Sequence, residues 1–383
     1  MKNNLIAALV TIQGLLSPVA GFAQGDLAPP AAPAPTMKTL DQVEARTIVN
    51  AANTPGDEAN TFIISQPGSY YLTGNITGAE GKHGISVEAD DVTLDLNGFA
   101  LISGGSGTVR GVNVPSAKIN FCVRNGTVRG WSDGGVRGEA ATGTAEKLRV
   151  ADNLGGIGLA MGNGSSMRDS EASNNATGFY APDRTSISNC ISTVNSGAGI
   201  LCTNYVTVLD CTVSRNGGVG IQLGGSSTVT RCTVTRNDLG GIAESGGGST
   251  ISECTAGSNP GNGIAVGTGS TVQNCTARLN TGSGITAMTA CYLTANKCDG
   301  NGTGISVTAP ADHGGAQNRI DGNSCTNNSV GISIAGFFNL TVRNHANGNS
   351  SQNYSISASF LNQTGPIETS GGTISSTSPW ANF

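Results

Sequence analysis

VTRCTVTRNDLGGIA (229–243) sets the pattern that decides the fold, because other stretches of the chain repeat it. VTVLDCTVSRNGGVGIQ (206–222) precedes it and TVQNCTARLNTGSGIT (271–286) follows it. Each stretch has a cysteine followed by Thr, then an Asn, and then a Gly-Ile pair. A cysteine that returns at this spacing is a candidate reactive thiol, disulfide partner, metal ligand or spacer in a stack.

A pair of Gly and an apolar residue marks each unit of this repeat, and the commonest gap between pairs is the 21 residues from Gly199 to Gly220. Within a unit, the apolar residue and the residue two places later share one face of a strand. The V-x-x-C spacing breaks this alternation and predicts a bend, so each unit contains three short strands. Twelve pairs begin at Gly84, Gly111, Gly135, Gly156, Gly178, Gly199, Gly220, Gly241, Gly263, Gly284, Gly304 and Gly331.

A single unit of this length cannot bury its apolar side chains alone, whereas stacked units can. Leucine-rich repeats need several Leu in each unit, and propeller blades need about 40–45 residues. The glycine- and aspartate-rich motif of calcium-binding nonapeptide solenoids is absent. The sequence therefore predicts an all-β fold, a right-handed parallel β-helix with three sides and about 12 coils.

The composition is typical of strands that are separated by frequent turns. Of 383 residues, 57 are Gly and 37% are hydrophobic, and the net charge is −5. Gly, Asn, Ser and Thr together with Val and Ile favour β-strands and turns, and the small net charge argues against a disordered chain. Because nucleic-acid binding needs a basic face, we expect no nucleic-acid partner.

The N-terminus carries the features of a secretory signal peptide, namely Lys2, an apolar run over 5–16, and the small residues Gly21 and Ala23. No other run approaches the ~20 apolar residues of a membrane helix, so we expect an exported chain without a membrane span. It would be periplasmic, extracellular or at the cell surface. The predicted segments are a signal peptide (1–23), a Pro/Ala-rich linker (24–36), an N-terminal cap with entry strands (37–80), the β-helix (81–350) and a C-terminal cap (351–383).

Aligned units place identical side chains in columns. Asn tolerates a left-handed backbone, and stacked Asn amides can bond one another, so the asparagine column predicts a structural ladder inside the coils. The cysteine column is continued by Asn296 and Asn323 in later units. The columns contain Cys190, Cys211, Cys232, Cys254 and Cys275, and Asn175, Asn195, Asn216, Asn237, Asn259, Asn280, Asn301 and Asn328.

The favoured interpretation of the cysteine column is a stack of buried free thiols, which behave as small apolar groups. Export and the even count of ten cysteines leave at least one disulfide as an open alternative. No Cys-x-x-Cys pairing with His occurs, so we predict no metal site. Arg231 is expected to face outward towards Asp210 rather than activate Cys232. The Thr residues that follow these cysteines are expected to face outward as ordinary β-formers.

Over about residues 70–360 the sequence resembles the pectin-lyase-like right-handed β-helix superfamily. Beyond the period, the resemblance rests on GSYYLTGNIT (68–77), DDVTLDLNGFALISG (90–104) and VRNGTVRGW (123–131), which look like the first coils of secreted β-helix proteins. It implies the fold, but the superfamily contains lyases, hydrolases, epimerases and adhesins, so it implies no single activity. Lyases of this fold hold Ca²⁺ on a uronate substrate, so Ca²⁺ is implied only for a lyase, and no other cofactor is expected.

Function on a solenoid is expected where the repeat is broken, because insertions become loops on one face. The first break lies between Gly84 and Glu139 and contains the densest group of charges in the chain. Carboxylates with an Arg or a second carboxylate are the groups that lyases and hydrolases use. The weak catalytic candidates are Asp133, Glu139, Arg129 and Arg137.

Four other residues are weak candidates for substrate binding. Trp131 and Tyr180 would stack on sugar rings, while Asp312 and His313 lie in the second break of the repeat. We therefore expect an exported protein that binds extracellular or cell-envelope polysaccharide, with cleavage by a lyase- or hydrolase-like reaction left open. Cleavage requires the catalytic candidates to converge in a groove. The alternative is a non-catalytic structural or adhesion protein, which requires no convergence.

Overall fold

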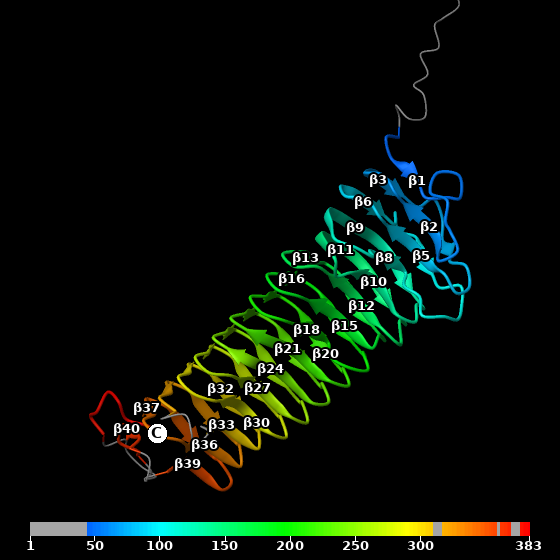
Figure 1. The fold of residues 1–383 in the computed structure, drawn as a ribbon. Coiled ribbons are helices and arrows are strands. Elements are labelled where there is room, and N and C mark those ends of the chain that lie inside the picture. The colour runs from blue at the N-terminus through cyan, green and yellow to red at the C-terminus, as the bar shows by residue number, and fades with distance from the viewer. Residues whose placement is uncertain (1–43, 309–315, 358–360, 369–375) are drawn as a thin grey trace, which may run out of the picture. The chain divides into compact units, whose positions relative to one another are not determined.

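The computed structural model describes residues 44–308, 316–357, 361–368 and 376–383. Residues 46–383 form one compact unit in which short parallel strands follow one another in successive coils (Figure 1). The described residues contain strands and no helix, which confirms the three-sided right-handed parallel β-helix. The predicted signal peptide (1–23) and linker (24–36) lie outside the described residues.

Face 1 is a parallel sheet of 14 strands in the described part of the chain. Its strands are β2 (Asn60–Ile64), β5 (His83–Val87), β8 (Val112–Asn113), β10 (Gly134–Gly138), β12 (Ile157–Met161), β15 (Thr177–Ala181), β18 (Ile200–Cys202), β21 (Val219–Gly225), β24 (Gly240–Gly247), β27 (Asn262–Val266), β30 (Ser283–Ala287), β33 (Thr303–Thr308), β36 (Val330–Ala335) and β39 (Gln352–Ile356).

Faces 2 and 3 join into one sheet because two long strands, β9 (Lys118–Arg129) and β11 (Ala141–Ala151), run through both. The other strands of face 2 are β1 (Thr47–Ile48), β3 (Gly68–Tyr71), β6 (Val92–Asp95), β13 (Ser166–Arg168), β16 (Ser186–Ser188), β19 (Thr207–Leu209), β22 (Thr228–Thr230), β25 (Thr250–Ser252), β28 (Thr271–Gln273), β31 (Tyr292–Thr294), β34 (Arg319–Asp321), β37 (Leu340–Val342) and β40 (Gln363–Thr364). The other strands of face 3 are β4 (Ile76–Thr77), β7 (Ala100–Ile102), β14 (Glu171–Ser173), β17 (Ile191–Thr193), β20 (Thr212–Ser214), β23 (Thr233–Thr235), β26 (Thr255–Gly257), β29 (Thr276–Arg278), β32 (Lys297–Asp299), β35 (Ser324–Thr326) and β38 (His345–Asn347).

The described coils number about 14 rather than the predicted 12, because a coil at each end lacks the Gly-apolar pair. In β2 the position of the glycine is taken by Thr61, next to Phe62. In β39 it is taken by Asn353, whose Oδ1 accepts a hydrogen bond from Asn349 and so ends the asparagine ladder. No further strand of face 1 follows β39 in the described residues, so the glycine is not required there.

The repeat also differs from the predicted alignment at one unit, which begins at Gly158 rather than Gly156. The stretch GGIGLA (155–160) contains two consecutive Gly-apolar pairs, and the second is the one in register, since Leu159 pairs with Val136 and Phe179. Leu159 is fully buried, whereas Ile157 is only half-buried. The outward position in this coil therefore belongs to Ala160 and not to Gly158.

A tight corner separates each pair of faces, and each corner has the same construction. One residue adopts a left-handed backbone, such as Arg236 (φ 57°) between faces 3 and 1, and the next residue, Asn237, points inward. Asn237 donates from its backbone N–H and its Nδ2 to Oδ1 of Asn259, and its Nδ2 also donates to the carbonyl of Val213. The predicted asparagine ladder is confirmed along this corner, from Asn153 to Asn349.

From Gly135 to Gly331, this ladder explains the glycine of each Gly-apolar pair, whereas Gly84 and Gly111 lie against Trp131. A Cβ on Gly220 would lie 2.6 Å from Nδ2 of Asn237 and 2.8 Å from the carbonyl oxygen of Gly241, and would also meet Val234. Contacts this short are not tolerated, so glycine is the residue that lets the strand of face 1 pass beside the amide. The ladder and the Gly-Ile pair are thus two parts of one packing arrangement.

The corner between faces 2 and 3 contains the cysteine column, which is buried as predicted from Cys190 to Cys275. The column passes to asparagine where Cys275 donates its N–H to Oδ1 of Asn296, and Asn382 near the C-terminus forms the last rung. Arg231, which precedes Cys232, has a left-handed backbone. Its side chain faces outward and pairs with Asp210 at 2.8 Å, as expected. The following threonines pair in register on face 3 and are exposed or half-buried.

The corner between faces 1 and 2 contains a third ladder that the sequence did not reveal. Its early rungs are small and varied, such as Ser227 and Ser249, and its late rungs are Asn318, Asn339 and Asn362. Along the axis the rungs change from Val206 through serines and Cys291 to asparagines, so no single residue type marks the column.

Candidate functional site

Outward-facing residues of face 1 form a column in which each coil contributes one side chain. Near the N-terminal end the column contains Ser86, Asn113, Arg137, Ala160 and Tyr180, in that order. Adjacent coils are spaced by about 4.8 Å, so Arg137 and Tyr180, two coils apart, are separated by roughly 10 Å along the axis. Charged and aromatic side chains thus stand in line on a surface that further along presents mainly small residues.

Two arginines meet at one carboxylate beside this column. Arg110 donates from Nε to Asp133 at 2.7 Å, and Arg137 donates from Nη1 to the same carboxylate at 3.2 Å. Arg137 also pairs through Nε with Glu139, and Arg110 donates to Oδ1 of Asn113 at 3.0 Å. The charged side chains are between 17% and 31% exposed. These contacts fix the guanidinium groups in place while leaving part of each accessible.

The long connections of the first coils position these groups, as expected from the break in the repeat. Arg110 precedes β8 and Asp133 precedes β10, so both lie where the chain enters face 1. Asp133 is anchored by its backbone N–H, which donates to the carbonyl of Val109, and Ser132 donates to the carbonyl of Gly107. The insertions therefore form one edge of face 1 at its N-terminal end.

His83 extends the group, which we call the face-1 cluster: His83, Arg110, Asp133, Arg137 and Glu139. Nδ1 of His83 accepts a hydrogen bond from the backbone N–H of Arg110 at 3.0 Å, so the proton of the neutral ring is on Nε2. Burial and the charge of Arg110 lower the pKa of His83. The imidazole is therefore neutral at neutral pH, with Nδ1 occupied by the backbone of Arg110 and Nε2–H as its hydrogen-bond donor.

The structure brings together three of the four catalytic candidates, Asp133, Arg137 and Glu139. Arg129 does not join them, because it ends β9 and pairs with Ile102 and Ala151 on face 3. His83 and Asn113 are members of the site that sequence reasoning did not select. Asn113 lies one strand before Arg137 in the same column, whereas His83 lies outside that column, beside Arg110.

The prediction that Trp131 stacks on a sugar ring is wrong, because its side chain is fully buried. The indole fills the corner of the first coils, where a Cβ on Gly78 or Gly84 would collide with it, and Nε1 donates to the carbonyl of Leu101 at 3.3 Å. Tyr180 is half-buried and faces outward in β15. Asp312 and His313 lie outside the described residues.

The described residues contain no group of three or more His, Cys, Asp and Glu side chains that is placed to hold a metal ion. Similarly, within the described ranges no helix is long and apolar enough to cross a membrane.

All ten cysteines carry free thiols; nine are buried and Cys122 is half-buried. Burial raises the pKa of Cys122, Cys202 and Cys291, which lowers the thiolate fraction that reacts. We expect a thiol reagent to modify at most Cys122 in the folded protein, and all ten thiols after unfolding without a reductant. A reduced and unfolded sample sets the full count. Fewer than ten thiols in the unreduced sample would show a disulfide and contradict the stack of free thiols.

Comparisons with known proteins agree with this architecture. A family model described as a right handed beta helix region matches residues 63–249 and 202–364. Among curated protein sequences, no match is found.

Solved structures with a similar fold include two modules from Azotobacter vinelandii. The A-module of mannuronan C-5 epimerase AlgE4 has a TM-score of 0.53 and 16% identity, over 78% of this chain and 91% of that one. The A-module of AlgE6 has a TM-score of 0.50 and 15% identity, over 76% of this chain and 91% of that one. At these identities the likeness shows the fold alone.

Proposed function

The chain belongs to the right-handed β-helix family, and from this premise we propose that it binds an extended polysaccharide along face 1 through the face-1 cluster. The observation that carries the proposal is the shared carboxylate of Asp133, which holds the guanidinium groups of Arg110 and Arg137 side by side at the surface. Donors that are already fixed lose little conformational freedom when a ligand binds. The similar A-modules are named for mannuronan, itself a polysaccharide, and this supports the same class of ligand.

The column on face 1 suits a linear polymer that lies along the axis. Arg137 and Tyr180 lie two coils apart in this column, with Ala160 between them, so sugar units separated by one residue of the polymer would meet a guanidinium and an aromatic ring. The predicted signal peptide would carry the protein to such polymers outside the cytoplasm. Binding, rather than cleavage, is favoured because both carboxylates of the face-1 cluster are engaged in ion pairs with Arg137 or Arg110.

We expect Arg137→Gln to weaken polysaccharide binding by about tenfold or more, because it removes charge-assisted hydrogen bonds of about 1.5–3 kcal/mol. Co-sedimentation with a panel of acidic and neutral polysaccharides, with and without added Ca²⁺, measures the affinity. Arg168→Gln is the matched control, since Arg168 is an exposed, ion-paired arginine on face 2. No binding to any polysaccharide would contradict the proposal and favour the structural or adhesion role. Equal affinity of the two variants would remove the face-1 cluster from the site.

His83 supports cleavage as a second candidate function, because the Nε2–H of a neutral imidazole beside the Arg110 guanidinium can stabilise negative charge that develops on a reacting oxygen. The same panel tests it through the ultraviolet absorbance of unsaturated uronate, which reports a lyase, and through new reducing ends, which both lyases and hydrolases produce. Cleavage by the wild type that is lost in His83→Gln would establish this function. Binding without either product would exclude it for the polymers tested.

A further inference from the structure

The C-terminal end of face 2 contains a second charged group, which sequence reasoning did not select. Asp321 lies on the outward side of β34, in register with Thr294 and Val342, yet its side chain is only 1% exposed. It is covered by Arg319 from the same strand and by Arg343, which follows β37. We call Arg319, Asp321 and Arg343 the face-2 cluster.

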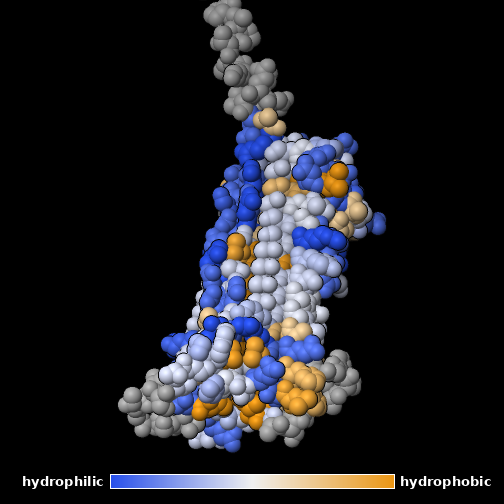
Figure 2. All heavy atoms as spheres, turned by 90° about the vertical axis from the view of Figure 1, so that its left-hand side faces the viewer, coloured by the Kyte–Doolittle hydropathy of each residue, from blue (hydrophilic) through white to orange (hydrophobic). Residues whose placement is uncertain are grey.

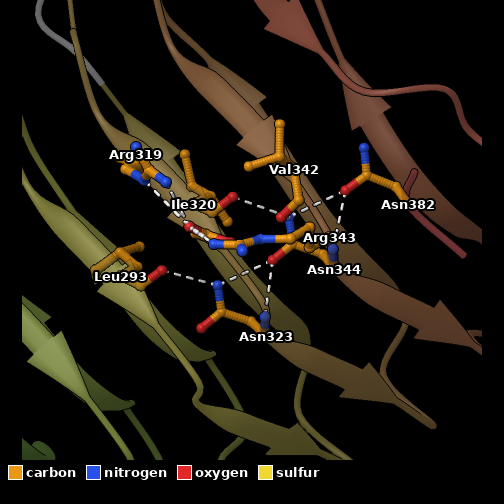
Figure 3. Close-up of polar contacts among 9 residues, drawn as sticks. Leu293, Arg319, Ile320, Asn323, Val342, Arg343, Asn344 and Asn382 are labelled. Carbon is orange, nitrogen blue, oxygen red and sulfur yellow. Dashed lines mark hydrogen bonds and ion pairs between the residues drawn. The ribbon is translucent and has the colours of Figure 1, made fainter. Parts of the chain in front are cut away.

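Both arginines are held by the buried carboxylate (Figure 3). Arg319 donates from Nε and Nη2 to Oδ2 of Asp321 at 3.1 and 2.8 Å, and Arg343 donates from Nε to Oδ1 at 2.7 Å and from Nη2 to Oδ2. Each arginine thus donates two of its five N–H groups to Asp321. Their side chains remain 45% and 48% exposed, so the guanidinium groups are fixed but accessible.

An aromatic ring accompanies each guanidinium group. Cζ of Arg343 lies 5.4 Å from the ring of Trp380, and Cζ of Arg319 lies 5.7 Å from the ring of Tyr292. Trp380 is 50% exposed and Tyr292 is 37% exposed. A ring that rests one face against a cation can offer its other face to the apolar side of a sugar.

Arg319 lines two neighbouring hollows, and Arg343 lies beside the first of them through its contact with the ring of Trp380. One, of about 450 Å³, is lined by Leu340, Val342 and Trp380 among others, and the second, of about 550 Å³, is lined by Tyr292 and Gln317. Such volumes suit a sugar unit or a short oligomer. Figure 2 shows apolar residues beside hydrophilic ones at the C-terminal end of this side of the unit. Two guanidinium groups against one carboxylate give the cluster a net charge of +1.

We propose that this hollow binds an anionic pyranose unit, whose carboxylate or sulfate meets Arg319 and Arg343 and whose ring stacks on Trp380. Guanidinium groups recognise carboxylates and sulfates through paired N–H bonds, and the apolar floor of Leu340 and Val342 complements the ring. The proposal extends the proposed polysaccharide binding to a second, charge-selective site. It does not depend on the face-1 cluster for its chemistry.

The two tryptophans of the chain allow a direct test, because Trp131 is buried and Trp380 is exposed. In the full chain, we expect acrylamide to quench the fluorescence of the exposed Trp380 and to leave the buried Trp131 almost unquenched. We expect trigalacturonic acid or a sulfated trisaccharide to protect Trp380 from quenching, and a neutral glucose trisaccharide to give no protection at the same concentration. Protection by only one of the acidic probes identifies the anion as carboxylate or as sulfate.

Variants test whether the protection of Trp380 depends on the face-2 cluster. Arg343→Gln and Arg343→Lys should each weaken binding of the acidic probe in calorimetry by about tenfold, since both remove the planar fork and Lys still supplies a charge to Asp321. Trp380→Leu should do the same while keeping an apolar cover. Arg231→Gln is the matched control, because Arg231 occupies the same left-handed corner position five coils earlier and pairs with Asp210.

Equal protection by the neutral trisaccharide, no protection by either acidic probe, or unchanged affinity in folded Arg343→Lys would overturn the proposal. The proposal is supported if the Arg343 and Trp380 variants lose affinity for the acidic probe while Arg137→Gln keeps it. If this test fails but polymer binding is still weakened by Arg137→Gln, the proposed function remains supported. The two claims are therefore separable.

Discussion

Replacing Asn237 by Ala is expected to lower the free energy of unfolding by about 4 kcal/mol, which is a large effect for one substitution. The side chain is fully buried and its Oδ1 accepts hydrogen bonds from the backbone N–H and the Nδ2 of Asn216. Its Nδ2 donates to the carbonyl of Val213 and to Oδ1 of Asn259. Alanine removes these four bonds, although Oδ1 of Asn259 keeps the bond from the backbone N–H of residue 237 and Nδ2 of Asn216 keeps its bond to Ser192. Each buried group that loses its partner costs about 1–3 kcal/mol before relaxation.

Chemical denaturation followed by far-ultraviolet circular dichroism measures this loss. Gln222→Ala is the control, since Gln222 also carries an amide but faces outward and is exposed on face 1. We expect the control to change stability by less than about 0.5 kcal/mol. A loss for Asn237→Ala no larger than that of the control would show that the ladder does not stabilise the fold.

Gly220→Ala is expected to cost about 3 kcal/mol, at the upper end of the range for overpacked cores. The added methyl group would meet Asn237, the carbonyl of Gly241 and Val234 from three sides. Two of these neighbours belong to the hydrogen-bonded framework of the next coil, so neither can move without breaking a bond. The substitution should also reduce the protection of the Asn237 amide in hydrogen exchange.

Gly74→Ala provides the comparison, because no heavy atom lies within 4 Å of the position its Cβ would take. There, alanine should be neutral or stabilise slightly by restricting the unfolded chain. Equal stability of Gly220→Ala and Gly74→Ala would contradict the steric explanation of the Gly-Ile repeat.

Most of the fold could be predicted from the sequence because each unit repeats the same local physics. The period, the bend before Cys232 and the inward column around Asn237 are visible as recurring residue types. The exact frame was harder to predict where two choices overlap, as at Gly156 and Gly158, because only the pairing of Leu159 with neighbouring coils decides between them. The end coils were missed because they lack the glycine that the interior coils need.

The candidate site was less predictable, because it depends on contacts between distant residues. The break in the repeat pointed to Asp133, Arg137 and Glu139, but nothing local reveals that Trp131 is enclosed by glycines of other coils. Likewise, Asp321 looks like an ordinary exposed residue of a strand until Arg343, 22 residues later, covers it. Charge pairing across coils is a property of the register and not of either segment alone.

Footprinting with hydroxyl radicals in the presence of the best-bound polysaccharide tests the central claim most directly, namely that face 1 holds the polymer through the face-1 cluster. Tyr180 lies in the column of face 1, whereas Tyr205 lies at the corner between faces 1 and 2 and is exposed. We expect the polymer to protect Tyr180 and His83 from oxidation and to leave the oxidation of Tyr205 unchanged. Unchanged oxidation of Tyr180 and His83 under conditions where the polymer is bound would contradict it.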